Sequence, residues 1–386
     1  MRDYFGKPIK KLGFGLMRLP VTGGDERTPI DIEHFKQMVD YYLGHGYSYF
    51  DTAYTYHGGR SEDAFRQAVT ERYPREAFQL TTKMPLWRPL NHDEMREITE
   101  ESLKRSGLDY FDLYFLHGIG PDRAPMLDKI KAWDYLQSLK ADGLAKNVGF
   151  SYHGDAEHLA RILDSRPAGE IDIVQLQLNY LDWESPHVQS RLCYETVVER
   201  GIGVIAMEPV KGGSLSNFAD SVAAILKNAE PEASLASWAI RFVYGLEGVI
   251  NVLSGMSTLE QVIDNVKTAD SYRPLTADDL ELLRQVTVAL EQIPLIPCTN
   301  CNYCVDDCPQ NIPTPRIIEI LNEYIKYQNQ SGCRRQYGFA VGGGFSGNEP
   351  VRGKSSDCTE CRTCEQHCPQ DIEIVEAHQR AVQLFE

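Results

Sequence analysis

Cysteines near the end of the chain form two runs with the same spacing. Each run reads C-x2-C-x2-C-x3-C-P, a spacing with which thiolates ligate [4Fe–4S] clusters. The first run contains Cys298, Cys301, Cys304 and Cys308 before Pro309, and the second contains Cys358, Cys361, Cys364 and Cys368 before Pro369. Together the runs use eight of the ten cysteines. We therefore expect the tail to bind two [4Fe–4S] clusters and to carry single electrons.

The proline in each run predicts which thiols share a cluster. Three cysteines on a short turn can converge on one cluster, whereas the fourth, next to the proline, points away to the other cluster, as in bacterial-type ferredoxins. The predicted assignment is therefore crossed. Cluster one takes Cys298, Cys301, Cys304 and Cys368, and cluster two takes Cys358, Cys361, Cys364 and Cys308.

Zinc binding and disulfide formation are the alternatives for these thiols. A single C-x2-C unit fits a zinc knuckle or a redox dithiol, but two matching runs of four cysteines favour clusters. Disulfides need an oxidising compartment, and the first residues show no secretory apolar segment. We therefore expect reduced thiols in a cytoplasmic protein. Outside the runs, Cys193 is expected to be packed in a helix and Cys333 to lie in a loop near the clusters.

The overall composition restricts the partners. The formal net charge of -16 would repel phosphates, so no nucleic-acid partner is expected. No stretch approaches the ~20 apolar residues of a membrane span. A redox partner with a basic docking face is compatible with this charge, although solubility is the simpler role for an acidic surface.

Alternating strand and helix patterns before residue 290 predict βα units around a parallel sheet. The predicted strands are 12–19, 47–52, 79–83, 111–117, 147–151, 171–178, 203–207 and 249–253. Eight such units, closed by a helix near 257–266, favour a (β/α)8 TIM barrel, with a doubly wound open sheet as the alternative. Ser61 is predicted to cap a helix, and residues 6–11 could form a hairpin below the barrel.

A helix predicted at 277–292 ends before Pro294, which marks a domain boundary. The barrel is therefore assigned to residues 1–293 and a mainly helical ferredoxin-type domain to 294–386. Residues 309–357 form an insert between the cysteine runs, with a helix predicted at 313–328. The glycine-rich segment 342–347 is expected to be a flexible loop, because it lacks the strand and helix that flank a dinucleotide-binding loop.

Polar residues stand at the ends of three predicted strands. Asp51, Lys83 and His117 end strands two, three and four, and Tyr56 follows five residues after Asp51. In a barrel of this type the strand C-termini face the active site. Each residue alone could be structural, as a barrel-mouth ion pair or a core histidine. Four of them in this arrangement favour catalysis.

The residues around these positions resemble the aldo-keto reductase family. The matching segments are Phe50-Asp51-Thr52-Ala53, Tyr56-His57-Gly58-Gly59-Arg60-Ser61-Glu62, Thr82-Lys83 and Leu116-His117-Gly118. The resemblance covers about residues 10 to 290 and implies the barrel fold and a nicotinamide cofactor. With its tail, the whole chain resembles the iron-sulfur-containing aldo-keto reductase-like oxidoreductases of bacteria and archaea.

The resemblance implies a catalytic role for each of the four residues. Tyr56 would be the general acid that protonates a carbonyl oxygen, with Tyr54 as the rival acid. Lys83 would lower the pKa of Tyr56 and Asp51 would keep Lys83 charged, because a phenol with an ordinary pKa of ~10 is a weak acid at neutral pH. His117 would orient the carbonyl.

The resemblance also implies a nicotinamide nucleotide site along the strand ends. Ser151 and Gln175 would bind the carboxamide, and Met207 would cover the ring. The loops after strands seven and eight would hold the phosphates. These loops and the closing helix contribute Pro209, Lys211, Gly212, Gly213, Gly255, Met256, Ser257, Gln261 and Asn265. Gln261 stands where NADPH-preferring members carry arginine, so the choice between NADH and NADPH stays open.

Three functions are compatible with the two halves. The first is an NAD(P)H-linked reductase of a small carbonyl or other unsaturated compound, whose clusters exchange electrons with a ferredoxin-like partner. Hydride transfer moves two electrons and each cluster one, so a flavin could mediate, and a barrel phosphate site could hold FMN. The second is a reductase with purely structural clusters, and the third is a non-enzymatic redox or nucleotide sensor subunit.

Overall fold

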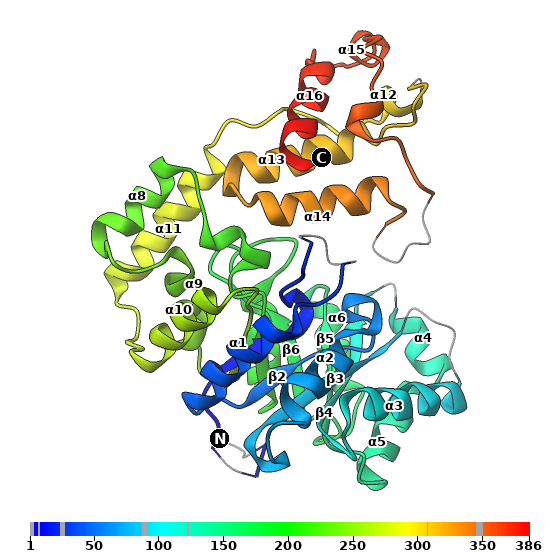
Figure 1. Ribbon diagram of the computed structural model, residues 1–386, viewed down its shortest axis with the longest axis vertical. Coiled ribbons are helices and arrows are strands. Elements are labelled where there is room, and N and C mark those ends of the chain that lie inside the picture. Colours follow the sequence, from blue (N-terminus) through cyan, green and yellow to red (C-terminus); the bar gives the residue numbers. More distant parts are fainter. Residues whose placement is uncertain are drawn as a thin grey trace. The chain divides into compact units, whose positions relative to one another are not determined.

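Eight strands in the described residues pair in parallel and in sequence order, and the pairing of the last with the first closes a barrel (Figure 1). The strands are β1 (Leu12–Gly15), β2 (Tyr49–Asp51), β3 (Gln79–Pro85), β4 (Phe111–Ile119), β5 (Ala145–Tyr152), β6 (Ile173–Gln177), β7 (Gly203–Met207) and β8 (Val249–Gly255). This confirms the predicted (β/α)8 fold and excludes the doubly wound sheet. The first strand is shorter than predicted, because Leu16–Arg18 form a 3-10 turn.

The computed structural model describes residues 4–6, 8–23, 28–86, 91–121, 123–306, 308–344 and 350–386. Two units are distinguished within the chain. Unit 1 comprises Met1–Lys211 and Ala236–Ala277, and unit 2 comprises Gly212–Leu235 and Asp278–Glu386. The boundary predicted at residue 293 lies within unit 2.

Helices alternate with the strands of unit 1 and bury their apolar faces against the barrel. They are α1 (Ile32–Gly44), α2 (Ser61–Phe65), α3 (His92–Ser106), α4 (Ala124–Lys129), α5 (Ala132–Ala141), α6 (Ala156–Asp164), α7 (Ser190–Val198), α9 (Leu235–Tyr244) and α10 (Leu259–Asp270). Cys193 lies buried in α7, as expected. The predicted capping role of Ser61 is wrong, because Ser61 is the first residue of α2 and its hydroxyl donates to the carbonyl of Leu16 instead.

The floor of the barrel is filled from the N-terminal segment. The side chain of Tyr4 is buried in an apolar cluster with residues that include Tyr49 and Phe115. Asn147 Nδ2 donates to the Tyr4 carbonyl over 2.6 Å. A Cβ atom at Gly203 would lie 2.8 Å from the Tyr4 ring, so glycine is needed there. No strand occurs in the described residues 4–6 and 8–11, so an inserted ring takes the place of the suggested hairpin.

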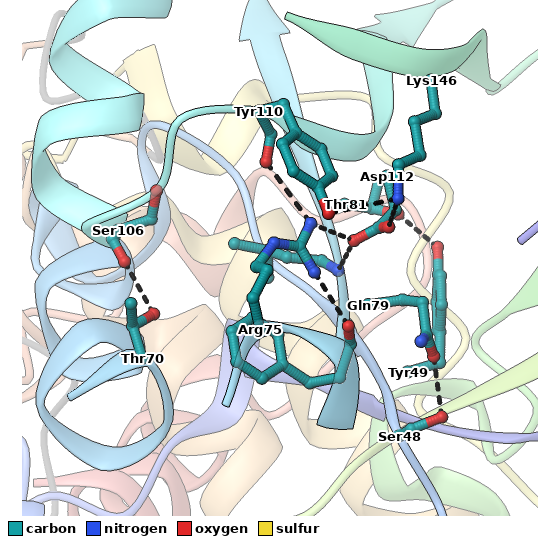
Figure 2. Close-up of polar contacts among 12 residues, drawn as sticks. Ser48, Tyr49, Thr70, Arg75, Gln79, Thr81, Ser106, Tyr110, Asp112 and Lys146 are labelled. Carbon is teal, nitrogen blue, oxygen red and sulfur yellow. Dashed lines mark hydrogen bonds and ion pairs between the residues drawn. The ribbon is translucent and has the colours of Figure 1, made fainter. Parts of the chain in front are cut away.

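Buried aspartates join neighbouring strands at their N-terminal ends. Asp112, at the start of β4, accepts the N–H of Leu80 in β3 over 3.0 Å and the Arg75 guanidinium over 2.6 Å (Figure 2). Lys146 Nζ lies 3.3 Å from the second carboxylate oxygen of Asp112. This network lies at the end of the barrel opposite to the strand C-termini, so it serves stability.

Unit 2 is helical in its described residues. Its helices are α8 (Asp220–Ala229), α11 (Ala277–Glu291), α12 (Tyr303–Asp306), α13 (Thr314–Tyr327), α14 (Gln330–Val341), α15 (Thr363–Gln366) and α16 (Ile374–Phe385). Helices α13, α14 and α16 pack around a core that contains Ile317, Leu321 and Phe385 (Figure 1). The expected helices at 277–292 and 313–328 are confirmed.

The insert between the cysteine runs contains Cys333 and the glycine-rich segment 342–347. Cys333 was expected in a loop, but it is buried in α14, where its thiol adds to the apolar core. The predicted flexible loop 342–347 falls partly on residues 345–347, which lie outside the described residues. Among the residues that the structure describes, no helix has the length and apolar character needed to cross a membrane.

Candidate active site and cluster cavities

Lys83 lies at the centre of a polar site at the C-terminal ends of β2 and β3. Its ammonium donates to Asp51 Oδ1 over 2.5 Å and to the Thr52 carbonyl over 2.7 Å. The other oxygen of Asp51 accepts Gln175 Nε2 over 3.0 Å. Lys83 and Asp51 are 1% and 4% exposed. Because both carboxylate oxygens accept hydrogen bonds, the arrangement is that of a buried ion pair.

The structure distinguishes the two tyrosines that follow Asp51. The Tyr56 hydroxyl accepts a hydrogen bond from Lys83 Nζ over 3.3 Å. The Tyr54 hydroxyl instead donates to Glu101 of α3 over 2.6 Å, and Arg105 lies over the Tyr54 ring. Tyr56 begins a 3-10 turn (Tyr56–Gly59) that contains left-handed residues. Of the two hydroxyl groups, that of Tyr56 is therefore the one bonded to the Lys83 ammonium, whereas that of Tyr54 is bonded to Glu101.

Burial and charge act in opposite directions on this site. Burial raises the pKa of the Tyr56 phenol above its usual value, and the Lys83 charge only partly offsets this. Burial lowers the pKa of Lys83, but Asp51 and Tyr56 outweigh it, so the Lys83 pKa is raised and the ammonium stays charged. Lys83 lowers the Tyr56 pKa, as expected, but desolvation outweighs it, so the net direction is upward.

His117 packs edge-on against Tyr56, with the ring centroids 5.7 Å apart. Burial, followed by the Lys83 charge, holds the pKa of His117 well below its usual range, so the ring is neutral at neutral pH. The next residue, Gly118, has a φ of 65°. Its carbonyl accepts Arg123 Nη1 over 2.6 Å. Arg123 thus supports the end of β4, and no sequence pattern indicated it.

The residues predicted to bind the nicotinamide lie on the same strand ends. Ser151 of β5 is paired in register with Gln175 of β6. Ser151 Oγ accepts the Gly118 N–H over 2.7 Å, and the Gln175 amide is bonded to Asp51. Met207 ends β7 and is partly exposed. The structure therefore brings Asp51 into direct contact with both Lys83 and Gln175, and it places Ser151 and Met207 on the same edge of the barrel.

The chain after β7 makes a left-handed turn. Lys211, Gly212 and Gly213 have φ values of 46°, 62° and 95°. Successive N–H groups in such turns can form an anion-binding nest. Lys211 Nζ donates to both oxygens of Asp182, over 2.7 and 2.9 Å. Gln177 and Asn179 also donate to Asp182. Asp182 was not predicted from the sequence, although it follows the C-terminus of a strand.

Gly212 and Gly213 belong to unit 2, where they contact the turn between α13 and α14. Asn329 Nδ2 donates to the Gly212 carbonyl over 3.2 Å, and Asn217 Nδ2 donates to the Gln328 carbonyl over 3.2 Å. The segment after β7 is thus bonded to the insert that separates the two cysteine runs.

The loop after β8 leads into α10. Gln261 Oε1 accepts the Ser257 N–H over 2.7 Å, and Ser257 Oγ donates to the Arg18 carbonyl over 2.7 Å. Asn265 Nδ2 donates to Ser254 Oγ over 2.8 Å. Gly255 and Met256 precede this helix start, where the positive end of the helix dipole favours phosphate. Gln261 therefore orders the loop.

The cysteines of unit 2 surround two cavities. One cavity is lined by Cys298, Cys301, Cys304 and Cys368. The other is lined by Cys308, Cys358, Cys361 and Cys364. In the described residues, no three of the thiols are arranged around a single metal ion. Each set of four surrounds a space instead, and the two sets are those of the crossed assignment.

Comparisons with known proteins match the same two parts of the chain. Residues 11–287 match the model of the aldo/keto reductase family, and residues 297–373 match that of the 4Fe-4S dicluster domain. An NADH-specific methylglyoxal reductase from Escherichia coli is 26% identical over 288 residues, which are 64% of this chain and 85% of that protein.

Two further relatives extend the comparison. A probable voltage-gated potassium channel subunit beta from Arabidopsis thaliana is 25% identical over 324 residues, covering 73% of this chain and 94% of that protein. The structure of an aldo-keto reductase from Klebsiella pneumoniae in complex with NADPH matches with a TM-score of 0.58 and 20% identity, covering 72% of this chain and 91% of that chain. The structural match shows the fold.

Proposed function

Because the chain belongs to the aldo/keto reductase family, we propose that it reduces a small carbonyl compound with NAD(P)H and exchanges electrons with a ferredoxin-like carrier through two [4Fe–4S] clusters. The observation that carries the proposal is the contact of Lys83 with both Asp51 and Tyr56 at the strand C-termini. The two cavities lined by four cysteines each support the electron-carrying part.

The proton chemistry follows from the direction of the hydrogen bonds. Lys83 donates to the Tyr56 oxygen, so the phenol proton is left to be donated to a carbonyl oxygen. As this proton leaves, the buried ammonium stabilises the phenolate that forms. Asp51 and the Thr52 carbonyl hold the ammonium in place. The neutral His117 ring can hydrogen-bond the same carbonyl without adding a positive charge.

The residues present fit a nicotinamide nucleotide. When bound, the reduced nicotinamide would supply hydride to the carbonyl carbon. Ser151 and Gln175 would hold the carboxamide and Met207 would cover the ring. The phosphates and the adenosine would be held by two segments. The first is Pro209 with the left-handed turn at Lys211, Gly212 and Gly213. The second is the start of α10 with Gly255, Met256, Ser257, Gln261 and Asn265. Identification of the cofactors extracted from the protein would show whether FMN accompanies them.

The experiment is an assay of anaerobically purified holoprotein with methylglyoxal and other aldehydes, using NADH or NADPH. Tyr56→Phe should lower kcat by about 10²- to 10⁴-fold, the usual contribution of a general acid. Tyr54→Phe is the matched control. It should keep most of the activity, because the Tyr54 hydroxyl is bonded to Glu101.

Two results would contradict the proposal. Equal losses in Tyr54→Phe and Tyr56→Phe would show that Tyr56 is not the acid. Absence of turnover with every nicotinamide or ferredoxin donor would favour a non-enzymatic subunit, and one relative is named as a probable voltage-gated potassium channel subunit beta.

A further inference from the structure

The cluster region of unit 2 repeats itself after sixty residues. Cys298 corresponds to Cys358, helix α12 to α15 and the start of α13 to that of α16. The correspondence extends to unusual backbone angles. Asn300, Asn302 and Asn311 have left-handed φ values of 58°, 65° and 51°, and their counterparts Glu360, Arg362 and Asp371 have 55°, 58° and 49°. The two halves therefore build equivalent environments, and any difference between them comes from side chains.

Apart from Thr363, which lines the second cavity without a counterpart in the first, the two cavities correspond position by position. Each residue that lines the first cavity has its counterpart in the second, with the fourth cysteine of each run exchanged between them. Most of these pairs are identical in type. The pairs that differ are Asn302 and Arg362, Pro315 and Val375, Ile318 and His378, and Ile374 and Thr314.

Two of these differences replace an apolar pair by a polar pair. In the first cavity, Ile318 and Ile374 are both buried. In the second cavity the same positions hold His378 and Thr314, whose Nε2 and Oγ1 atoms lie 3.0 Å apart. Ser355 Oγ lies 3.1 Å from Nδ1 of the same ring. His378 and Thr314 are 3% and 1% exposed, so the second cavity has buried dipoles where the first has hydrocarbon.

The charged residues near the second cavity contribute less. Arg362 lines the second cavity and forms ion pairs with Glu365 over 2.8 Å and with Glu376 over 3.0 Å, so one positive charge faces two carboxylates that do not themselves line the cavity. Arg362 and Glu376 are also about half exposed, and water and salt screen such groups. The His378–Thr314 pair is buried and lines the second cavity itself, whereas Glu365 and Glu376 stand behind that lining.

We propose, building on the proposed function, that the two clusters have different reduction potentials and that the cluster held by Cys308, Cys358, Cys361 and Cys364 is the more easily reduced. Hydrogen bonds and polarity around a cluster stabilise its reduced, more negative state and so raise its potential. An electron shared between the two sites would then reside on the second. No proton moves and no co-reactant is needed, because reduction of one site balances oxidation of the other.

The test is a redox titration of the anaerobic holoprotein followed by EPR. Two midpoint potentials are expected, separated by at least a tenfold difference in the reduction equilibrium constant, or ~59 mV for one electron. Thr314→Val removes the hydroxyl at nearly constant size and should lower the upper midpoint only. Ile374→Thr introduces a hydroxyl into the other cavity and should raise the lower midpoint.

Ile374→Val is the matched control, since it changes size without polarity, and it should leave both midpoints in place. A single shared midpoint in the unmodified protein would overturn the inference, as would a Thr314→Val protein in which only the lower midpoint moves. If Thr314→Val loses its clusters, Ile374→Thr still decides. Folded protein without iron would refute the cluster part of the proposed function, whereas two clusters with equal potentials would refute this inference alone.

Discussion

Tyr54 and Tyr56 show how strongly the surroundings determine the chemistry of one residue type. Both follow Asp51 within five positions, yet one hydroxyl bonds to Glu101 and the other to Lys83. For Tyr56, desolvation and the Lys83 charge oppose each other, and the pKa stays above that of a free phenol. The proton is thus retained at neutral pH, and Lys83 acts by stabilising the phenolate once the proton moves.

This balance predicts the effect of Lys83→Met. Without the ammonium the Tyr56 pKa should rise further, and kcat should fall by about tenfold to a hundredfold, equivalent to one or two pKa units. Protonated Tyr56 is the active form, so the unmodified protein should lose carbonyl reduction only as the pH rises above the usual pKa of tyrosine. The Lys83→Met variant should lose it at a still higher pH. The pH dependence of kcat, together with ultraviolet difference titration against Tyr56→Phe, measures this shift.

The control for this prediction is Asp51→Asn combined with Lys83→Met. The double variant removes the carboxylate that the single variant leaves buried without its ammonium partner. It should recover stability but not activity. If the loss of kcat at high pH moved to a lower pH in Lys83→Met, this would contradict the role assigned to Lys83 and Tyr56.

At the scale of the elements, buried aspartates fasten strand to strand. Asp112 accepts the Leu80 N–H and is paired with Arg75 (Figure 2). Asp172, just before β6, accepts the Val148 N–H over 2.9 Å and Lys140 Nζ over 2.8 Å. The same arrangement therefore occurs between β3 and β4 and between β5 and β6. In both cases a backbone N–H of one strand donates a charge-assisted hydrogen bond to an aspartate at the N-terminal end of the next strand.

We expect Asp112→Ala to destabilise the barrel by about 3–5 kcal/mol, because it leaves the Arg75 charge and the Leu80 N–H without their buried acceptor. Urea unfolding followed by tryptophan fluorescence measures this, since all four tryptophans lie between residues 87 and 238. Lys146→Met should cost at most ~1 kcal/mol, because Lys146 is half exposed. Equal losses in the two variants would show that the carboxylate is not the essential partner.

At the scale of the whole molecule, the segment after β7 is bonded to the insert between the cysteine runs. Asn329 donates to the Gly212 carbonyl and also caps α14 by accepting the Gly332 N–H over 3.1 Å. Within unit 2, Asn329 is therefore a positioning residue for the turn at Gly212 and Gly213, which is proposed to hold nucleotide phosphates.

Asn329→Asp separates these two roles of Asn329. The carboxylate keeps the acceptor for α14 but removes the donor to Gly212, so the Kd for NAD(P)H should rise severalfold while thermal stability and cluster absorbance stay close to those of the unmodified protein. Ser331→Ala removes only the bond from Ser331 to Asn329 and should leave the Kd unchanged. Titration by nucleotide fluorescence measures the Kd, and an unaltered value in Asn329→Asp would contradict the positioning role.

Local patterns in the sequence predicted most of the fold. The alternation of apolar runs and amphipathic segments indicated eight βα units, and the C-x2-C-x2-C-x3-C-P spacing indicated two sets of thiols. These features depend on neighbouring residues, so they are readable along the chain. The positions of Asp51, Lys83 and His117 at strand ends followed from the same pattern, because parallel strands end on one face of a barrel.

Contacts between distant residues were decided only by the tertiary structure. Examples are the bond of Tyr54 to Glu101, the Tyr4 ring beneath the barrel and the burial of Cys333 in α14. The net direction of the Tyr56 pKa also depended on folding, because desolvation is a sum over everything packed around the phenol. The sequence by itself therefore determined which chemical groups the protein has and on which elements they lie. Packing determined which groups meet and how strongly each is shifted.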